Sequence, residues 1–216
     1  MEMTLVDGNM VLVAHQFNPA IIDKHWLIKH GIVTEDDILS GGIYIPHLSR
    51  MNTKDFRLTV FPEQLQFSPV NPNECSQEQI RNMLGGIVER LPETPYMAAG
   101  INFLWHLTPD VTMQAFTRGL FYQEGKVHEF FDTLDGRYGA YFSREIFGTR
   151  LKLDIKPITI NIENALTEKL QCSFNYHKDL VSEDKVTEIL ETIQVWEEAK
   201  KTSLQIMERL KGEGEI

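Results

Sequence analysis

Four polar side chains stand where two expected strands end, and their types could form a binding site. Asn102 and His106 interrupt a central apolar segment, and Asn175 and His177 lie in a later strand-like segment. Each strand ends in the same way, with Asn, aromatic residues and His. If the two strands are neighbours, the four side chains line one polar pocket that could serve a small-molecule-binding protein or an enzyme. The competing interpretation is that each residue lies at the edge of the core and makes one hydrogen bond.

No other group of reactive residues has the spacing of a known chemistry. His25 and His30 are five residues apart on an expected helix and face different ways, so they do not form a helical metal site. The sequence contains neither HExxH nor GxSxG, and no Lys-Ser/Thr follows either glycine pair, Gly41-Gly42 or Gly85-Gly86. We therefore expect no metal and no cofactor, and a non-enzymatic protein rather than an enzyme.

Charge and cysteine content restrict the partners and the compartment. The chain has 31 acidic and 21 basic residues and a net charge of -10, so it repels phosphate. Nucleic acid and anionic membranes are accordingly poor candidate partners. Cys75 and Cys172 lie far apart and have no metal-type neighbours, which is typical of free thiols in a reducing cytosol. With no apolar stretch of about 18 residues and no signal-peptide pattern at the N-terminus, we expect a cytoplasmic protein.

The central segment 95–109 organises the expected fold. It is almost unbroken apolar residues with a proline at each end, which predicts a strand covered on both faces. Gly100 at its centre indicates that a backbone or a side chain approaches closely there. Layers supplied by the rest of the chain must then cover the strand from both sides.

The remaining elements alternate at first and then become a strand meander. Ser76 and Gln79 form a capping-box pair at the start of an amphipathic helix that ends at Leu91. Further strands are expected at 11–17, 55–67, 137–147, 150–162 and 168–177, and a further helix at 18–30. This order is typical of an α+β fold, with a largely antiparallel sheet flanked by helices. We expect a single compact domain, 1–216, with two similar-sized α+β halves, 1–108 and 109–216, as the finer division.

A long final helix is expected from residue 183 to residue 210. At 1.5 Å per residue it would span about 42 Å, which is long for a domain of this size. Its distal half would then overhang the domain and pack on a partner; the alternative is that it lies along its own sheet. The candidate interface residues are the apolar ones of its stripe: Trp196, Leu204, Met207 and Leu210.

Two functions from different classes follow. The first is a non-enzymatic cytoplasmic protein that acts through protein–protein interaction, as a homodimer or with another protein. The alternative is a small-molecule-binding protein or enzyme with a polar site near His106 and His177.

Overall fold

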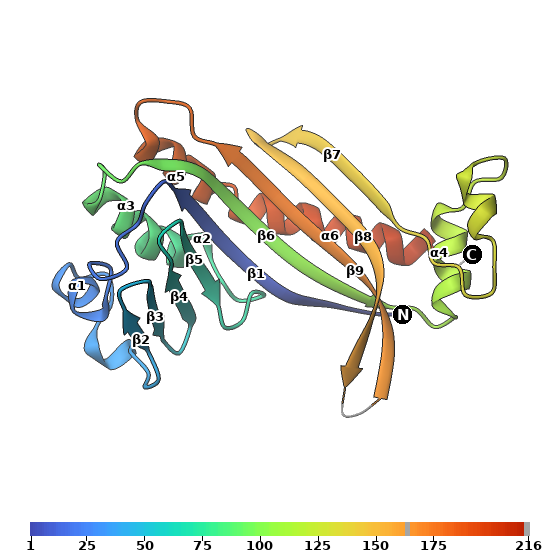
Figure 1. The fold of residues 1–216 in the computed structure, drawn as a ribbon, viewed down its shortest axis with the longest axis horizontal. Helices are drawn as coiled ribbons and strands as arrows, with labels where there is room; N and C mark the ends of the chain where they lie inside the picture. Colours follow the sequence, from blue (N-terminus) through green and yellow to red (C-terminus); the bar gives the residue numbers. More distant parts are fainter. Residues whose placement is uncertain (163–164, 214–216) are drawn as a thin grey trace.

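The chain forms one antiparallel sheet of nine strands, flanked by helices (Figure 1). A computed structural model describes residues 1–162 and 165–213. The strands are β1 (Glu2–Ala14), β2 (Ile43–Ile45), β3 (Leu48–Asn52), β4 (Phe56–Val60), β5 (Gln64–Pro69), β6 (Tyr96–Thr108), β7 (Ala140–Ile146), β8 (Thr149–Ile162) and β9 (Ala165–Asp179). Their order is β2-β3-β4-β5-β1-β6-β9-β8-β7, which confirms the α+β class and the antiparallel sheet.

Helices lie at both ends of the sheet and behind its middle (Figure 1). They are α1 (Lys24–Lys29), α2 (Gln77–Ile80), α3 (Gly86–Arg90), α4 (Met113–Phe121), α5 (Lys185–Gln194) and α6 (Trp196–Glu213), with 3₁₀ turns η1 (Glu35–Asp37) and η3 (Val127–Phe131). The predicted capping box at Ser76 is confirmed: its hydroxyl accepts from the Gln79 amide, and its own amide donates to the Gln79 side chain. A π-helical turn, residues 81–85, joins α2 to α3.

β6 lies in the middle of the sheet between β1 and β9, and the described part of the chain covers only one of its faces. Ile101, Phe103 and Trp105 are buried under α5 and α6, whereas the alternate residues Asn102 and Leu104 are half-buried on the opposite, open face. The prediction of cover on both faces was therefore wrong. Leu104 and the small residues of the open face gave the segment a continuous apolar character, although residues 1–162 and 165–213 form no second layer over them.

Gly100 on the same strand is not a point of unusually close approach. A Cβ atom added there would lie 3.6 Å from Nδ2 of Asn175, which is an ordinary van der Waals distance. The glycine leaves space beside Asn175, but a Cβ atom at this position would fit there as well.

The C-terminal region is helical, but it is two helices rather than one. The break falls at Val195, and Asp184, not Ser182, caps the first helix by accepting from the Thr187 amide at 3.0 Å. α6 is the long C-terminal helix, and it runs along its own sheet behind β6, β9 and β8 (Figure 1). Its distal half does not overhang, since Met207 is fully buried.

Trp196, at the start of α6, fixes the helices to the sheet. Its ring is fully buried with its centroid 4.8 Å from that of Phe103, and its Nε1 donates to the Cys75 carbonyl at 3.3 Å. Two more hydrogen bonds follow along α6: Tyr176 donates to the Ala199 carbonyl at 3.0 Å, and the Trp105 indole donates to Ser203 at 3.0 Å. The polar atoms of Trp196, Tyr176 and Trp105 are thus all hydrogen-bonded.

One core runs along the sheet from β3 to β8. Its buried side chains come from β1, β3, β4, β5, β6, β8 and β9 and from the helices behind them. The division into two halves at residues 108 and 109 stays a prediction. Within the described ranges 1–162 and 165–213, no helix has the length and apolar character needed to cross a membrane.

Replacing Trp196 tests the dependence of the fold on this contact. We expect Trp196→Ala to lower the free energy of unfolding by about 3–5 kcal/mol, because a large cavity opens between α6 and β6. The measurement is urea denaturation followed by circular dichroism. Gln194→Ala, at an exposed position two residues earlier, is the matched control and should change stability by less than about 0.5 kcal/mol. Equal effects of the two changes would contradict this role for Trp196.

Candidate functional site

Asn102 and Asn175 lie side by side on the open face, within a row of three asparagines. The strand register places Asn102 opposite Asn9 on β1 and opposite Asn175 on β9. Asn102 donates to the Asn9 side chain at 2.8 Å and accepts from Asn175 at 2.7 Å. The row therefore ties the three central strands together through their amide groups. Asn9 escaped sequence reasoning because only the register brings it next to Asn102.

The two histidines are separated along the same face. His106 pairs with Gln171, whereas His177 pairs with Gly100, six residues further along β6. At about 3.4 Å per residue this is a separation of about 20 Å. His177 faces Asp179, with Nε2 3.0 Å from the carboxylate, while Nε2 of His106 is buried with no hydrogen-bond partner among the described residues. His106 and His177 therefore cannot contact one small substrate together.

The apolar residues expected to form an interface on the last helix pack against the chain itself. Trp196 and Met207 are fully buried in the core, and Leu204 and Leu210 are half-buried against it. Neither Trp196 nor Met207 is exposed to a partner. The stripe on this helix is explained by the sheet that it covers.

β7 is an edge strand with aromatic side chains exposed on both faces. Among the described strands it pairs only with β8. Tyr141 is 62% exposed on the open face, and Phe142 is 54% exposed on the face that carries the helices. An edge strand presents unpaired backbone groups that can accept another strand. Sequence reasoning placed a strand here but gave no sign that it would lie at the edge.

The turn after β7 shows which backbone groups are free. Phe147 and Gly148 both have positive φ, 55° and 67°, as a two-residue type I′ turn requires. Such a turn places Ile146 and Thr149 in a hydrogen-bonded pair, and hydrogen-bonded pairs alternate along an antiparallel ladder. The N–H and C=O groups of Tyr141, Ser143 and Glu145 therefore point away from β8, toward the open edge.

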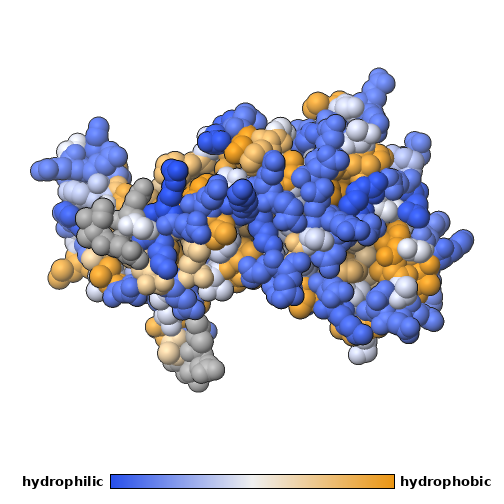
Figure 2. Space-filling model, turned by 180° about the vertical axis from the view of Figure 1, so that it is seen from behind, coloured by the Kyte–Doolittle hydropathy of each residue, from blue (hydrophilic) through white to orange (hydrophobic). Residues whose placement is uncertain are grey.

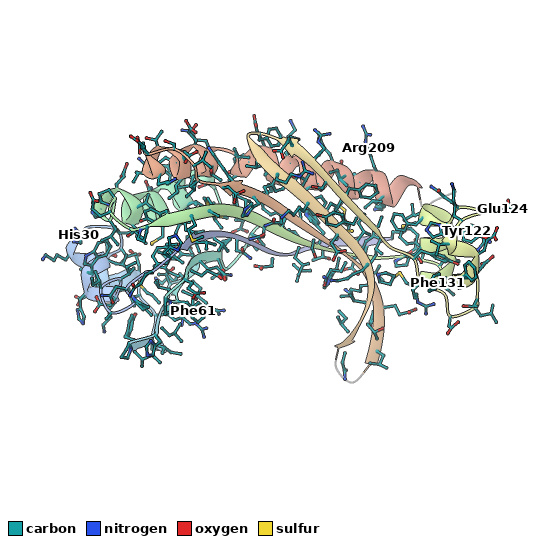
Figure 3. The ribbon with its side chains drawn as sticks, turned by 45° about the horizontal axis from the view of Figure 1, so that its top comes forward. His30, Phe61, Tyr122, Glu124, Phe131 and Arg209 are labelled. Carbon is teal, nitrogen blue, oxygen red and sulfur yellow. The ribbon has the colours of Figure 1, made fainter. Side chains whose placement is uncertain are left out.

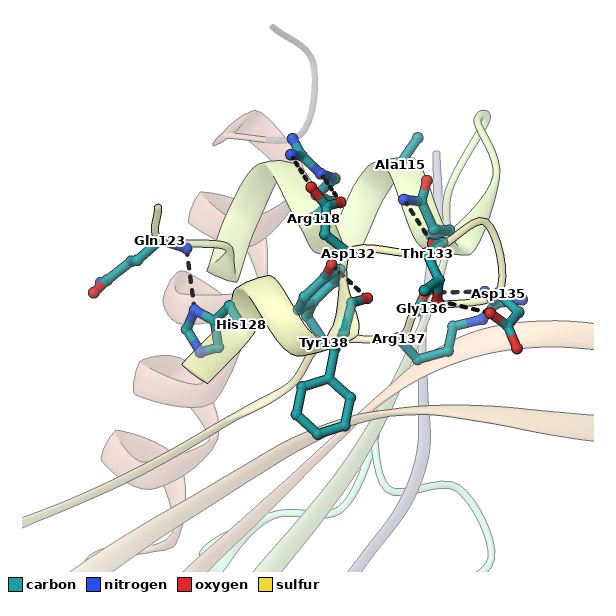
Figure 4. Close-up of polar contacts among 12 residues, drawn as sticks. Ala115, Arg118, Gln123, His128, Asp132, Thr133, Asp135, Gly136, Arg137 and Tyr138 are labelled. Carbon is teal, nitrogen blue, oxygen red and sulfur yellow. Dashed lines mark hydrogen bonds and ion pairs between the residues drawn. The ribbon is translucent and has the colours of Figure 1, made fainter. Parts of the chain in front are cut away.

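A small module, residues 110–139, leads directly into β7 and lies at one end of the molecule (Figure 3). We call it the end module; it contains α4 and η3. Arg118 on α4 donates twice to Asp132, at 2.8 and 2.9 Å (Figure 4). Its guanidinium carbon also lies 4.1 Å from the Tyr122 ring centroid. The hydrogen bonds from Arg118 hold the pKa of the Asp132 carboxyl below its usual value. Tyr138 donates to the Phe131 carbonyl at 2.9 Å and so ties η3 to the start of β7.

Several apolar side chains of the end module are exposed to solvent. Phe130 is 85% exposed and Leu134 is 99% exposed, with Phe131 exposed between them. Exposed apolar residues that lie together mark interaction surfaces more often than isolated ones do. By contrast, hydrophilic side chains cover most of the side on which α5 and α6 lie (Figure 2).

The pH dependence of stability tests the placement of His106. Burial of the ring, and next the charge of Lys169, lower the pKa of His106 from its ordinary value of 6.5. The unfolded chain therefore binds a proton at His106 at higher pH than the folded chain does. The neutral ring contributes fully to the free energy of unfolding above about pH 6.5, and this contribution is lost as the pH falls below that value. We expect denaturation curves of His106→Gln to lose less stability between about pH 7 and about pH 5.5 than those of the unmodified chain. The same loss in both proteins would contradict the assignment.

The sequence matches no protein-family model, and none of the curated proteins compared with it matches.

Proposed function

We propose that this is a cytoplasmic protein that acts through protein–protein contact and forms a homodimer by pairing β7 with β7 of a second copy. The observation that carries the proposal is the free edge of β7, with Tyr141 and Phe142 exposed on its two faces. Strand addition at an open edge gives backbone hydrogen bonds, and the alternate side chains give specificity. Two buried free thiols, Cys75 and Cys172, support the reducing compartment.

One antiparallel register satisfies the edge best. With Ser143 opposite Ser143 of the second copy, the outward-facing groups of Tyr141 meet those of Glu145. Each of the three outward-facing residues has one donor and one acceptor, so this register allows about six hydrogen bonds between the copies. Shorter overlaps leave some of these groups unpaired.

The side chains of β7 favour the same register. Around Ser143, Tyr141 lies opposite Glu145 of the second copy on one face, and Phe142 lies opposite Arg144 of the second copy on the other. An arginine beside an aromatic ring is a favourable pair, and so is a tyrosine hydroxyl beside a carboxylate. Moving the centre by one residue toward the turn would place Arg144 opposite its own copy, where like charges repel.

The end module adds surface to this strand contact. Antiparallel pairing brings the start of one β7 next to the end of the other, so each end module comes close to the β7–β8 turn of the second copy. Phe147 is exposed at that turn, which gives Phe130 and Phe131 an apolar neighbour. A stable dimer buries about 800 Å² on each partner, more than one short strand supplies. The exposed apolar residues of the module supply the remainder.

The alternative of a polar site shared by His106 and His177 has less support, because the register holds them about 20 Å apart. Asn102 and Asn175 are adjacent, but the side chain of each is already hydrogen-bonded to an asparagine of a neighbouring strand.

A proline at the edge tests the proposal. Ser143→Pro removes an N–H that points away from β8, so the β7–β8 hairpin keeps its ladder while the pairing between copies loses its central hydrogen bonds. We expect the unmodified chain to be dimeric in sedimentation at micromolar concentration and Ser143→Pro to be monomeric. Ser143→Ala, which keeps the N–H, is the matched control and should remain dimeric. A monomeric unmodified chain, or a folded and dimeric Ser143→Pro, would refute the proposal.

Cross-linking tests the register itself. Directly opposite residues of a hydrogen-bonded pair lie about 5.5 Å apart at Cα, within reach of a disulfide. Ser143→Cys should therefore form a covalent dimer under mild oxidation, read on a non-reducing gel. Glu145→Cys is the control on the same face. In this register the two copies of residue 145 lie four residues apart along the strands, so they should not cross-link. The native Cys75 and Cys172 do not compete, because burial raises the pKa of each thiol to about 12. Equal cross-linking of the two variants would overturn the register.

A further inference from the structure

A cleft of about 420 Å³ lies between the β7–β8 hairpin and the distal half of α6. Its volume is within the range of about 300–1,000 Å³ that small-molecule sites occupy. It lies on the face that carries the helices, away from the asparagine row.

The walls of the cleft are apolar. Leu151, Leu153 and Ile155 of β8 form its floor and are buried, and Ile206 and Leu210 of α6 form the opposite wall. The half-exposed ring of Phe142 stands at the edge. Such walls fit an aliphatic chain or a flat ring and give no partner to a polar body.

The charged residues of the cleft are all of one sign. Arg144 comes from β7 and Arg209 from α6, so the two guanidinium groups belong to opposite walls; Figure 3 shows Arg209 extending from α6. Among the described side chains, neither lies within 4.0 Å of a carboxylate oxygen. Two cationic groups at one apolar cleft are notable in a chain of net charge -10. Arginine is suited to bind a carboxylate through two parallel hydrogen bonds.

We propose that this cleft binds an amphipathic carboxylate of the fatty-acid type. The aliphatic chain lies on Leu153 and Ile206, and the carboxylate is held by Arg144 and Arg209. The site is built within one chain, although Phe142 and Arg144 also face the second copy in the dimer proposed above.

The charge and the cavity can be tested separately with dodecanoate as the probe. Titration calorimetry is performed below the micelle concentration, and dodecyltrimethylammonium, with the same chain and the opposite charge, is the comparison ligand. We expect dodecanoate to bind and the cation to bind at least about tenfold more weakly, since a hydrogen bond to a charged group is worth about the free energy of a tenfold change.

Three variants assign the binding to this cleft. Arg144→Gln with Arg209→Gln removes the cations and should weaken dodecanoate binding about tenfold or more. Ile206→Trp fills the cleft without changing its charge and should weaken both ligands. Lys152→Gln removes a cation from the opposite face of β8, between two residues of the cleft floor, and should leave binding unchanged.

Several results would overturn the proposal. These are the absence of dodecanoate binding, equal binding of the two ligands, and equal effects of Lys152→Gln and the double arginine variant. Unchanged binding in a folded Ile206→Trp would also overturn it. Because Phe142 and Arg144 also face the second copy in the proposed dimer, the titrations are performed at protein concentrations below and above that of dimer formation. Absence of dodecanoate binding at both concentrations overturns the cleft and leaves the role of β7 to its own tests.

Discussion

The packing of Trp196 against Phe103 is the contact on which the rest of the structure depends. It places the start of α6 over the middle of the sheet, and the hydrogen bonds from Tyr176 and Trp105 then hold α6 along β6 and β9. Two helices can cover only one face of a sheet this wide. The chain is therefore a two-layer structure with one covered face and one open face, and each further property follows from this asymmetry.

The open face must be stable in water, and the two edges must be managed. Asn9, Asn102 and Asn175 satisfy one another across the central strands, so this face needs no second layer. The β2 edge is only three residues long, whereas β7 offers seven residues and carries exposed aromatics. Short edges resist strand addition and longer ones invite it, which makes β7 the place where the sheet can extend. At this edge the β7–β8 hairpin and the distal half of α6 are not fully packed against each other. The arginine-lined cleft lies between them.

Local patterns in the sequence predicted the elements well and their surroundings less well. The capping box at Ser76, the late meander and the apolar stripe of the last helix were all readable, because each depends on residues near one another in the chain. The break at Val195 was not, since neither proline nor glycine marks it. The prediction that both faces of β6 are covered failed because Leu104, an apolar residue, lies on the open face. Asn102 and Asn175 are adjacent because the antiparallel register places Asn175 beside the middle of β6, not because both lie near strand ends. The separation of His106 from His177 depends on register, which only pairing sets.

Hydrogen exchange along β7 tests the central claim most directly. In one copy, the amides of Phe142 and Arg144 bond to β8, whereas those of Tyr141, Ser143 and Glu145 face the open edge. Pairing between copies must protect the second group and only at concentrations where the dimer forms. The account predicts that exchange at Tyr141, Ser143 and Glu145 slows as the protein concentration rises, while Phe142 and Arg144 stay protected throughout. Fast exchange at the three edge amides at every concentration, in a protein that remains folded, would contradict it.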